Sequence, residues 1–423
     1  MKENLNLNST EREAKLFILN VLLKGLQLSE PCDESFNEQV FKIPDFFDEA
    51  KFKRGQKYFA ENRFGILLSN LCGLFSLICE PNGAKFLDNT NYSSTASLAR
   101  KRYVRTILHV LLWCTEELSY ESRSWKSLKK VRKMHLSASN ASLIKGGLGI
   151  SQMFMSFTTF GFMGYALIKP QLLGIKYDSK EDREAYVHMW AVITSMLGIK
   201  DEYNMCLHKF VVVEMICHIQ IRYFFNPLLQ METKIFQKLG QALCDGLKYH
   251  IPFLSYKYCL FLTRRLAGIP GYQFDVDLSK EFLIRQIFTK SELEIIKAKY
   301  QNFKGFENYK GLIFAEKMHI IDIKRNPEVI FETDDQKRII INLLELEYPD
   351  KLELIEYNDE NYKSFLNDKK FDTLKKSDRC LVKLMIQSLN SSKYFITKYI
   401  AELSLSAFLK VMKTCESNYT NFN

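Results

Sequence analysis

Hydrophobic residues recur with a helical period from about residue 50 to residue 268, and no part of this stretch alternates as a strand would. Turn-forming residues interrupt the period at 80–83, at 137–149 and at 169–170. The pattern therefore predicts an all-α fold. The expected helices are Phe52 to Ala60, Arg63 to Cys79, Ser94 to Ser119, Ser124 to Met134, Ile150 to Ile168, Lys180 to Leu197, Asp201 to Phe225, and a stretch from Leu228 to His250.

The composition of the chain changes at Gly268-Ile269-Pro270-Gly271, after which Lys, Asp, Glu and Asn become more frequent. This change predicts a large helical domain over 46–268, followed by a mainly helical extension over 272–423. A polar, helical lead is expected over 1–45. Short strands around Pro327 to Glu332 and Lys351 to Tyr357 are the expected exceptions.

Phe64 to Cys79 and Ile150 to Ile168 are the most apolar of the longer segments. Both carry Ser, Asn, Gln or Thr, and both are at or below the length that spans a bilayer. We expect them to be buried core helices, with membrane association as the alternative.

The composition allows a large buried core, because 47% of the 423 residues are hydrophobic and 13% are aromatic. The 32 phenylalanines and 21 tyrosines either fill a helical core or also line an apolar pocket. The formal charge of +10 suits an anionic surface but does not predict a nucleic-acid-binding protein, because the basic residues are not extensively clustered.

One modest basic cluster has helical spacing. Lys126, Lys129, Lys130 and Lys133 recur at i, i+3, i+4 and i+7. They therefore predict one solvated helix face, with attraction to a membrane surface as the alternative.

The ten cysteines include no Cys-x-x-Cys pair, which argues against a structural zinc site or a redox pair. Most lie in apolar stretches, where a free thiol behaves as a small hydrophobe and a reducing compartment is the simplest setting. The N-terminal segment has only a short apolar run and no small-residue cleavage site. We expect an intracellular protein, cytoplasmic or associated with the ER membrane.

A polar stripe follows the expected helix over 94–119. Arg102, Arg105, Thr106, His109 and Trp113 share one face, because positions three, four and seven residues apart lie above one another on a helix. Charged groups among apolar neighbours are costly to bury without partners, so the stripe predicts an anionic or polar ligand or contact.

A second candidate residue, His135, follows Leu128 and Val131 at i, i+3 and i+7. The spacing predicts that its imidazole faces inward at the end of a helix, beside a loop. A hydrogen-bonded core histidine is the alternative interpretation.

Two motifs follow each other along the chain, Arg-x-x-basic-Thr and, about thirty residues later, Val-Arg-x-Met-His. This pattern resembles the rubber oxygenase (latex clearing protein) and ER-bound oxygenase mpaB family. The resemblance extends over much of residues 50–245. Its other pieces are Phe52 to Gln56, Asn62 to Gly65, Phe86 to Thr90, Gln152 to Phe162, Pro170 with Gly174-Ile175, Tyr186 to Trp190, and Leu197 to Asp201.

This resemblance implies a globin-like helical core, one non-covalent haem b and the use of O2 to cleave a carbon–carbon double bond. His135 would be the axial iron ligand, and Arg102, Arg105 and Thr106 would line the distal side. A neutral imidazole can hold haem iron from one side, while donors on the other side can hydrogen-bond bound oxygen.

The resemblance also gives expectations for the rest of the cofactor site. His109 is expected at a haem edge or propionate or as a second ligand, with a polar core contact as the alternative. Arg132 and Lys101 are candidates to pair with the propionates. The substrate would be an apolar small molecule or polymer, such as an isoprenoid or a fatty chain.

Two positions depart from the family pattern. Arg105 stands where the rubber oxygenases have a lysine, and its planar guanidinium is a better hydrogen-bond donor than metal ligand. Phe154 stands where the family has an acidic residue, so no acid–base carboxylate is expected there.

Other enzyme classes lack their signatures, since the chain has no Gly-rich phosphate loop, no Gly-x-Ser-x-Gly and no His-Glu-x-x-His. Two non-enzymatic alternatives stay open at this point. One is a haem- or lipid-binding module without turnover, and the other is a membrane-associated structural protein.

Overall fold

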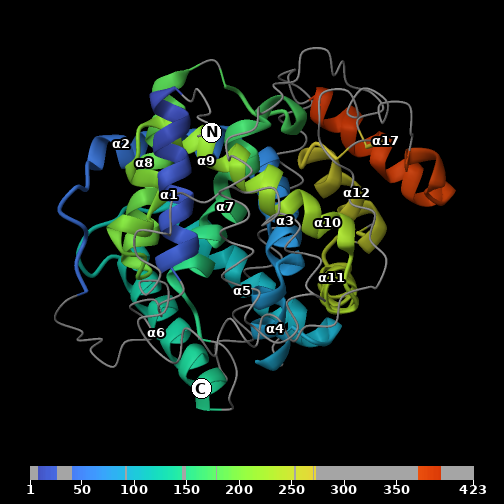
Figure 1. Cartoon of the computed structure of the whole chain (residues 1–423), viewed down its shortest axis with the longest axis horizontal. Helices are drawn as coiled ribbons and strands as arrows, with labels where there is room; N and C mark the ends of the chain where they lie inside the picture. Colours follow the sequence, from blue (N-terminus) through green and yellow to red (C-terminus); the bar gives the residue numbers. More distant parts are fainter. Residues whose placement is uncertain are drawn as a thin grey trace, which may run out of the picture.

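A computed structural model describes residues 8–25, 41–90, 93–144, 149–177, 179–251, 254–269, 271–272 and 370–391. Every regular element in these ranges is a helix, and they contain no strand, so the all-α prediction is confirmed. Figure 1 shows the helices packed around two central ones, α3 and α7. The two short strands expected at 327–332 and 351–357 lie outside the described residues.

The longer helices are α1 (Ser9–Lys24), α2 (Glu49–Glu61), α3 (Arg63–Cys79), α4 (Pro81–Asn89), α5 (Ala96–Thr115), α6 (Arg123–Ile144), α7 (Gln152–Ile168), α8 (Lys180–Met196), α9 (Phe210–Gln220), α10 (Asn226–Met231), α11 (Lys234–Leu247), α12 (Tyr256–Leu266) and α17 (Lys376–Ser391). Short 3-10 turns are η3 (Pro170–Leu173), η4 (Asp201–Tyr203), η5 (Met205–Leu207) and η12 (Lys370–Thr373).

Local sequence signals explain where most helices start. Asn8 and Glu11 form a capping box at α1, in which each side chain accepts a hydrogen bond from the other residue's backbone N–H. Side-chain oxygens also cap the first turns of other helices, and each satisfies one backbone donor that the helix leaves free. These capping residues are Asp48, Thr95, Ser151, Ser179, Thr233 and Ser255.

The core forms where α3 and α7 cross at short range. Gly73 on α3 faces the backbone of Gly161 on α7, and a Cβ on Gly73 would collide with the Gly161 carbonyl. Phe160 and Phe75 are fully buried beside this crossing. Around it, α2 packs on α8, α1 on α9 and α5 on α11. The two most apolar segments are therefore mostly buried core helices, as their sequence predicts.

Asn62 joins α2 to α3 across a sharp bend. Its side-chain amide donates to the Tyr58 carbonyl at 3.0 Å, and its Oδ1 accepts from the Lys176 backbone at 2.9 Å. Within the described ranges, no single helix has the length and apolarity to cross a membrane, and α2 with α3 passes that test only as a pair bent by 90°.

The loop expected at 80–83 is wrong, because α4 begins at Pro81. Proline is well tolerated in the first turn of a helix, where its missing N–H has no intrahelical partner in any case. The Gly83 N–H donates to the Glu80 carboxylate at 2.6 Å, so Glu80 supplies the cap.

The loop expected at 137–149 is also wrong over its first half, since α6 continues to Ile144. Ser139 and Ser142 are buried there, and Ser139 Oγ accepts a hydrogen bond from the Ile150 N–H at 2.8 Å. Tertiary packing thus overrides the weak helix propensity of these serines. His135 consequently lies within α6 and not at its end.

The long helix expected from Asp201 to Phe225 is interrupted. Residues 201–207 form the turns η4 and η5, α9 follows, and Ile221–Phe225 is one π-helical turn. The stretch expected from Leu228 to His250 divides into α10 and α11 at Glu232, whose φ is 46°. The helix α12 lies beyond the last individually predicted helix but within the stretch of helical periodicity that ends at residue 268.

From the extension over 272–423, the structure describes η12 and α17, which is helical as expected. This helix packs against α12 of the large domain (Figure 1). Ser255 Oγ, which precedes α12, donates to the buried Asp378 carboxylate at 2.6 Å.

Candidate functional site

A cavity of about 2080 Å³ lies among α3, α5, α6 and α7, and α12 and α17 contribute to its wall. It is about twice the upper end of the usual range for small-molecule pockets, roughly 300–1,000 Å³. The leucines of α3 show why the space stays open. Leu67, Leu71 and Leu74 lie one turn apart and are only half-buried, because their side chains pack against the core on one side and line the cavity on the other.

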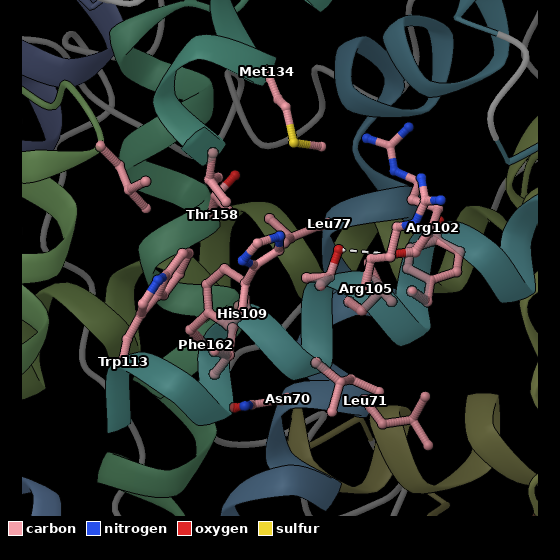
Figure 2. A pocket seen from close by; sticks show the side chains of 18 of the residues that line it. Asn70, Leu71, Leu77, Arg102, Arg105, His109, Trp113, Met134, Thr158 and Phe162 are labelled. Carbon is pink, nitrogen blue, oxygen red and sulfur yellow. Dashed lines mark hydrogen bonds between the residues drawn. The ribbon is translucent and has the colours of Figure 1, made fainter. Parts of the chain in front are cut away.

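The stripe predicted on the helix over 94–119 lines one wall of this cavity. Arg102, Arg105, Thr106, His109 and Trp113 all contribute to the wall from α5. Figure 2 shows Arg102, Arg105, His109 and Trp113 along that side, facing Leu77 of α3 and Phe162 of α7.

Arg102 contributes a positive charge to the cavity wall. Its guanidinium has no hydrogen-bond or ion-pair partner among the described residues, and burial lowers its pKa from the ordinary arginine value. A desolvated cation without a counter-ion is costly. The cavity therefore favours a ligand that carries negative charge near Arg102.

His135 on α6 lines the same cavity. It makes no hydrogen bond to any described residue, and its Nδ1 is buried without a partner. Burial, together with the positive charge of Arg102, lowers the pKa of the imidazole to about 4. At neutral pH, His135 is thus an uncharged imidazole that keeps some surface open to the cavity.

His109 is held by neighbours in a way that His135 is not. Its Nδ1 lies 2.7 Å from Ser127 Oγ, which also accepts a hydrogen bond from Trp113 Nε1 at 2.8 Å. The His109 and Trp113 rings stack at an interplanar angle of 27°. Burial, with the charges of Lys130 and Arg105, lowers the pKa of His109 to about 4.

Arg105 and Thr106 are the most accessible members of the stripe, and both are exposed where they line the cavity. Thr106 Oγ1 donates to the Arg102 carbonyl of its own helix at 3.0 Å, which occupies the hydroxyl proton. Arg105 has no hydrogen-bond or ion-pair partner among the described residues. Of the two, Arg105 is the donor that is available to a ligand.

The two residues expected at haem propionates lie in different places. Lys101 lines the cavity. Arg132 is not among its described lining residues, and its guanidinium donates to the Met196 carbonyl at 3.4 Å and lies 5.9 Å from the Phe41 ring centroid. Phe154 lines the cavity, and its ring centroid lies 6.3 Å from that of Phe86.

The lysine face of α6 belongs to the cavity as well as to solvent. Lys126, Lys129, Lys130 and Lys133 all line it, although their spacing alone predicts only a solvated face. The sequence feature that could have indicated this location is the position of Lys133, two residues before the inward-facing His135. Lys129 also lies 4.9 Å from the centroid of the Trp125 ring.

The donors in the cavity suit a group that needs one protein ligand. In the described part of the chain, no three His, Cys, Asp or Glu side chains converge as they would around a bare metal ion. Haem iron needs only one axial imidazole, and haem also presents flat apolar faces and two carboxylates. A neutral His135, an apolar wall and the Arg102 guanidinium fit those requirements. Metal-bound histidines usually donate a hydrogen bond from the ring nitrogen that does not hold the metal, but no described residue accepts one from His135 Nδ1.

Comparisons with known proteins give one distant structural similarity. No family model and no curated protein matches this sequence. A solved structure of latex clearing protein in the closed state aligns with 80% of this chain and 89% of its own length, at a TM-score of 0.44 and 16% sequence identity.

Proposed function

We propose that this protein is a haem b-dependent oxygenase that uses O2 to oxidise or cleave a carbon–carbon double bond in an isoprenoid or other lipid-like substrate. The observation that carries the proposal is His135, a neutral and unpartnered imidazole on the wall of a large apolar cavity, with the Arg102 charge acting on it. The motif resemblance described above supports the same assignment.

His135 would hold the haem iron, and Arg102 would stabilise a haem carboxylate or other negative charge beside it. The bound haem would supply the activation of O2 for the reaction. Arg105 would donate hydrogen bonds to oxygen atoms that gain negative charge, because its guanidinium is not used elsewhere in the described residues. The Thr106 hydroxyl would first have to leave the Arg102 carbonyl.

The apolar residues of α3 and α7 would align a hydrocarbon chain and exclude water from the reacting double bond. Leu71, Leu77 and Phe162 face the cavity beside the polar stripe (Figure 2). Cleavage of the double bond by one O2 molecule places one oxygen atom on each of two carbonyl products, so the atoms balance without a further oxidant.

The first test is the visible absorption spectrum of the full chain, produced with added haem precursor and recorded oxidised and reduced. We expect a Soret band in the wild type and its loss in His135→Ala. Circular dichroism must show that the variant keeps its helices. Added imidazole should restore the band, because it can occupy the space that the side chain leaves.

His250→Ala is the matched control, because His250 also lines the cavity. Its Soret band should stay unchanged. A folded wild type that takes up no haem, or a His135→Ala variant with an unchanged reduced spectrum, would refute the assignment.

Turnover is tested by mixing the reduced, haem-loaded protein with prenyl lipids and ¹⁸O2 and analysing carbonyl products by mass spectrometry. One labelled oxygen atom is expected in each product. Arg105→Met should lower the rate about 10²-fold or more if the guanidinium stabilises developing charge, since removing one such donor costs roughly 10²–10³ in kcat.

A haem- or lipid-binding protein without turnover is the second candidate function. The observation in its favour is the lack of an available carboxylate. Glu121 is the only acid among the described lining residues, and it lies 3.3 Å from Lys126. A stable Soret band without any substrate-dependent labelled product would favour this function over the oxygenase.

A further inference from the structure

The described residues that line the cavity carry a strong excess of positive charge. Seven lysines and arginines contribute to the wall, against the single carboxylate of Glu121, which Lys126 already neutralises. The seven are Lys101, Arg102, Arg105, Lys126, Lys129, Lys130 and Lys133. All of them come from α5 and α6, so the charge lies on one side of the cavity.

Two of these cations, one on each helix, lie near His109. Arg105 comes from α5 and Lys130 from α6, and these two helices pack together. Arg105 lies one turn before His109 on α5, and Lys130 lies one turn after Ser127, whose Oγ is 2.7 Å from His109 Nδ1, so both side chains are near the same ring. Neither cation has a hydrogen-bond or ion-pair partner among the described residues, so both are available to a ligand.

The opposite side of the cavity is mainly apolar, with Asn70 of α3 and Thr158 and Thr159 of α7 as its polar residues. α3 contributes five leucines and Phe64, α7 contributes Phe154 and Phe162, and α17 closes one part with Leu381, Leu384 and Met385. A hydrocarbon chain gains about fourfold in affinity for each methylene that it buries completely, from about 0.8 kcal/mol per CH₂. The apolar side therefore selects a long chain, and the cationic side selects an anionic head group.

We infer that the cavity binds a single-chain anionic amphiphile, with a carboxylate or phosphate head on Arg105 and Lys130 and its tail along α3 and α7. This inference deepens the proposed function by naming its substrate class, and only the fate of the bound chain rests on haem chemistry. Fatty acids and prenyl phosphates share the required head-group charge, and the experiment distinguishes them.

The three tryptophans of the chain provide a direct readout. Trp113, Trp125 and Trp190 are all buried, and all line the cavity. Bromine atoms quench tryptophan fluorescence on contact, so 9,10-dibromostearate reports entry of a tail into this space. Its methyl ester has the same tail without the charge and is the matched ligand control.

In the haem-free full chain, dibromostearate should quench the fluorescence saturably, and the methyl ester should bind at least about 10-fold more weakly. Arg105→Met and Lys130→Met should each weaken the acid about 10-fold and change the ester less than about 2-fold. Lys257→Met, an exposed lysine of α12 outside the cavity wall, should leave both affinities unchanged. Displacement of the bromo acid by oleate or by farnesyl phosphate, each against its neutral alcohol, identifies the preferred head group.

Equal affinity for acid and ester, or unchanged affinity in both cation variants, would overturn the inference. The transfer rate of haem to apomyoglobin separates a second explanation. If both variants accelerate haem loss but leave dibromostearate affinity unchanged, the two cations serve only the haem propionates and the inference is wrong. Binding to phosphatidylglycerol vesicles without binding of monomeric acid would also overturn it, in favour of a membrane surface.

Because these titrations use haem-free protein, their result does not depend on a Soret band. If the protein binds dibromostearate but takes up no haem, it is an anionic-lipid carrier. If it takes up haem but does not bind dibromostearate, it is an oxygenase for neutral chains.

Discussion

Two histidines that line the cavity, His109 and His135, differ in how their neighbours restrain them. His109 shares Ser127 with Trp113, so its ring is fixed by a hydrogen bond and by stacking. His135 has no such restraint, and its buried Nδ1 has no partner. A buried nitrogen without a hydrogen-bond partner destabilises the folded protein, and a bound group that contacts it can offset this cost. At the residue scale, His135 is therefore the ligand candidate and His109 is a structural residue beside the head-group cations.

The Ser127 hydroxyl gives a prediction at this scale. Ser127→Ala removes the acceptor of the buried Trp113 N–H and the partner of His109 Nδ1, so we expect a loss of about 1–3 kcal/mol in the free energy of unfolding. Denaturant titration in urea measures it. Ser137→Ala on the same helix is the control, because Ser137 is exposed and makes no hydrogen bond to the described residues. Equal effects of the two substitutions would contradict the role given to Ser127.

Helical periodicity predicted most of the elements, and for α3 it predicted both ends. It failed where packing decided the outcome. The Ser- and Asn-rich composition at the end of α6 predicts a loop, but Ser139 and Ser142 are buried there and the helix continues. Periodicity also identifies the face that carries Arg102 and His109 but not what that face meets. The cavity arises from contacts between helices distant in sequence, such as α3 and α7, and Lys130 approaches that face through the packing of the consecutive helices α5 and α6.

At the element scale, the crossing of α3 and α7 holds together two helices that line the cavity. A Cβ on Gly73 would collide with the backbone of Gly161, so Gly73→Ala must push the two helices apart. We expect destabilisation by about 1–3 kcal/mol or more, as for other overpacked cores, despite the better helix propensity of alanine. Thermal and urea unfolding measure it.

Ser69→Ala is the matched control on the same helix. Ser69 is fully buried and its hydroxyl has no hydrogen-bond partner in the described residues. Removing an unsatisfied polar group should be neutral or stabilising. If Gly73→Ala were as well tolerated as Ser69→Ala, the close approach of the two helices would not be a constraint on the fold.

At the scale of the whole molecule, the cavity wall is assembled from segments far apart in the chain. α17 supplies Leu381, Leu384 and Met385 to a space that otherwise belongs to the helices before residue 270. Its first turn is tied to α12 by the hydrogen bond between Ser255 and the buried Asp378. The described helix α17 of the extension thus contributes to the cavity wall, which composition alone could not show.

Asp378→Ala should loosen this closure. The substitution removes a short hydrogen bond to a carboxylate, a contact worth about 1.5–3 kcal/mol, and a negative charge that favours the N-terminal turn of α17. We expect amide hydrogen exchange to accelerate about 10-fold or more across α17, while α3 and α7 keep their protection. Asp372→Ala, an exposed carboxylate just before the helix, should change nothing. If Asp378→Ala leaves the exchange of α17 unchanged, or accelerates exchange equally in α3, then this contact does not hold α17 against the cavity.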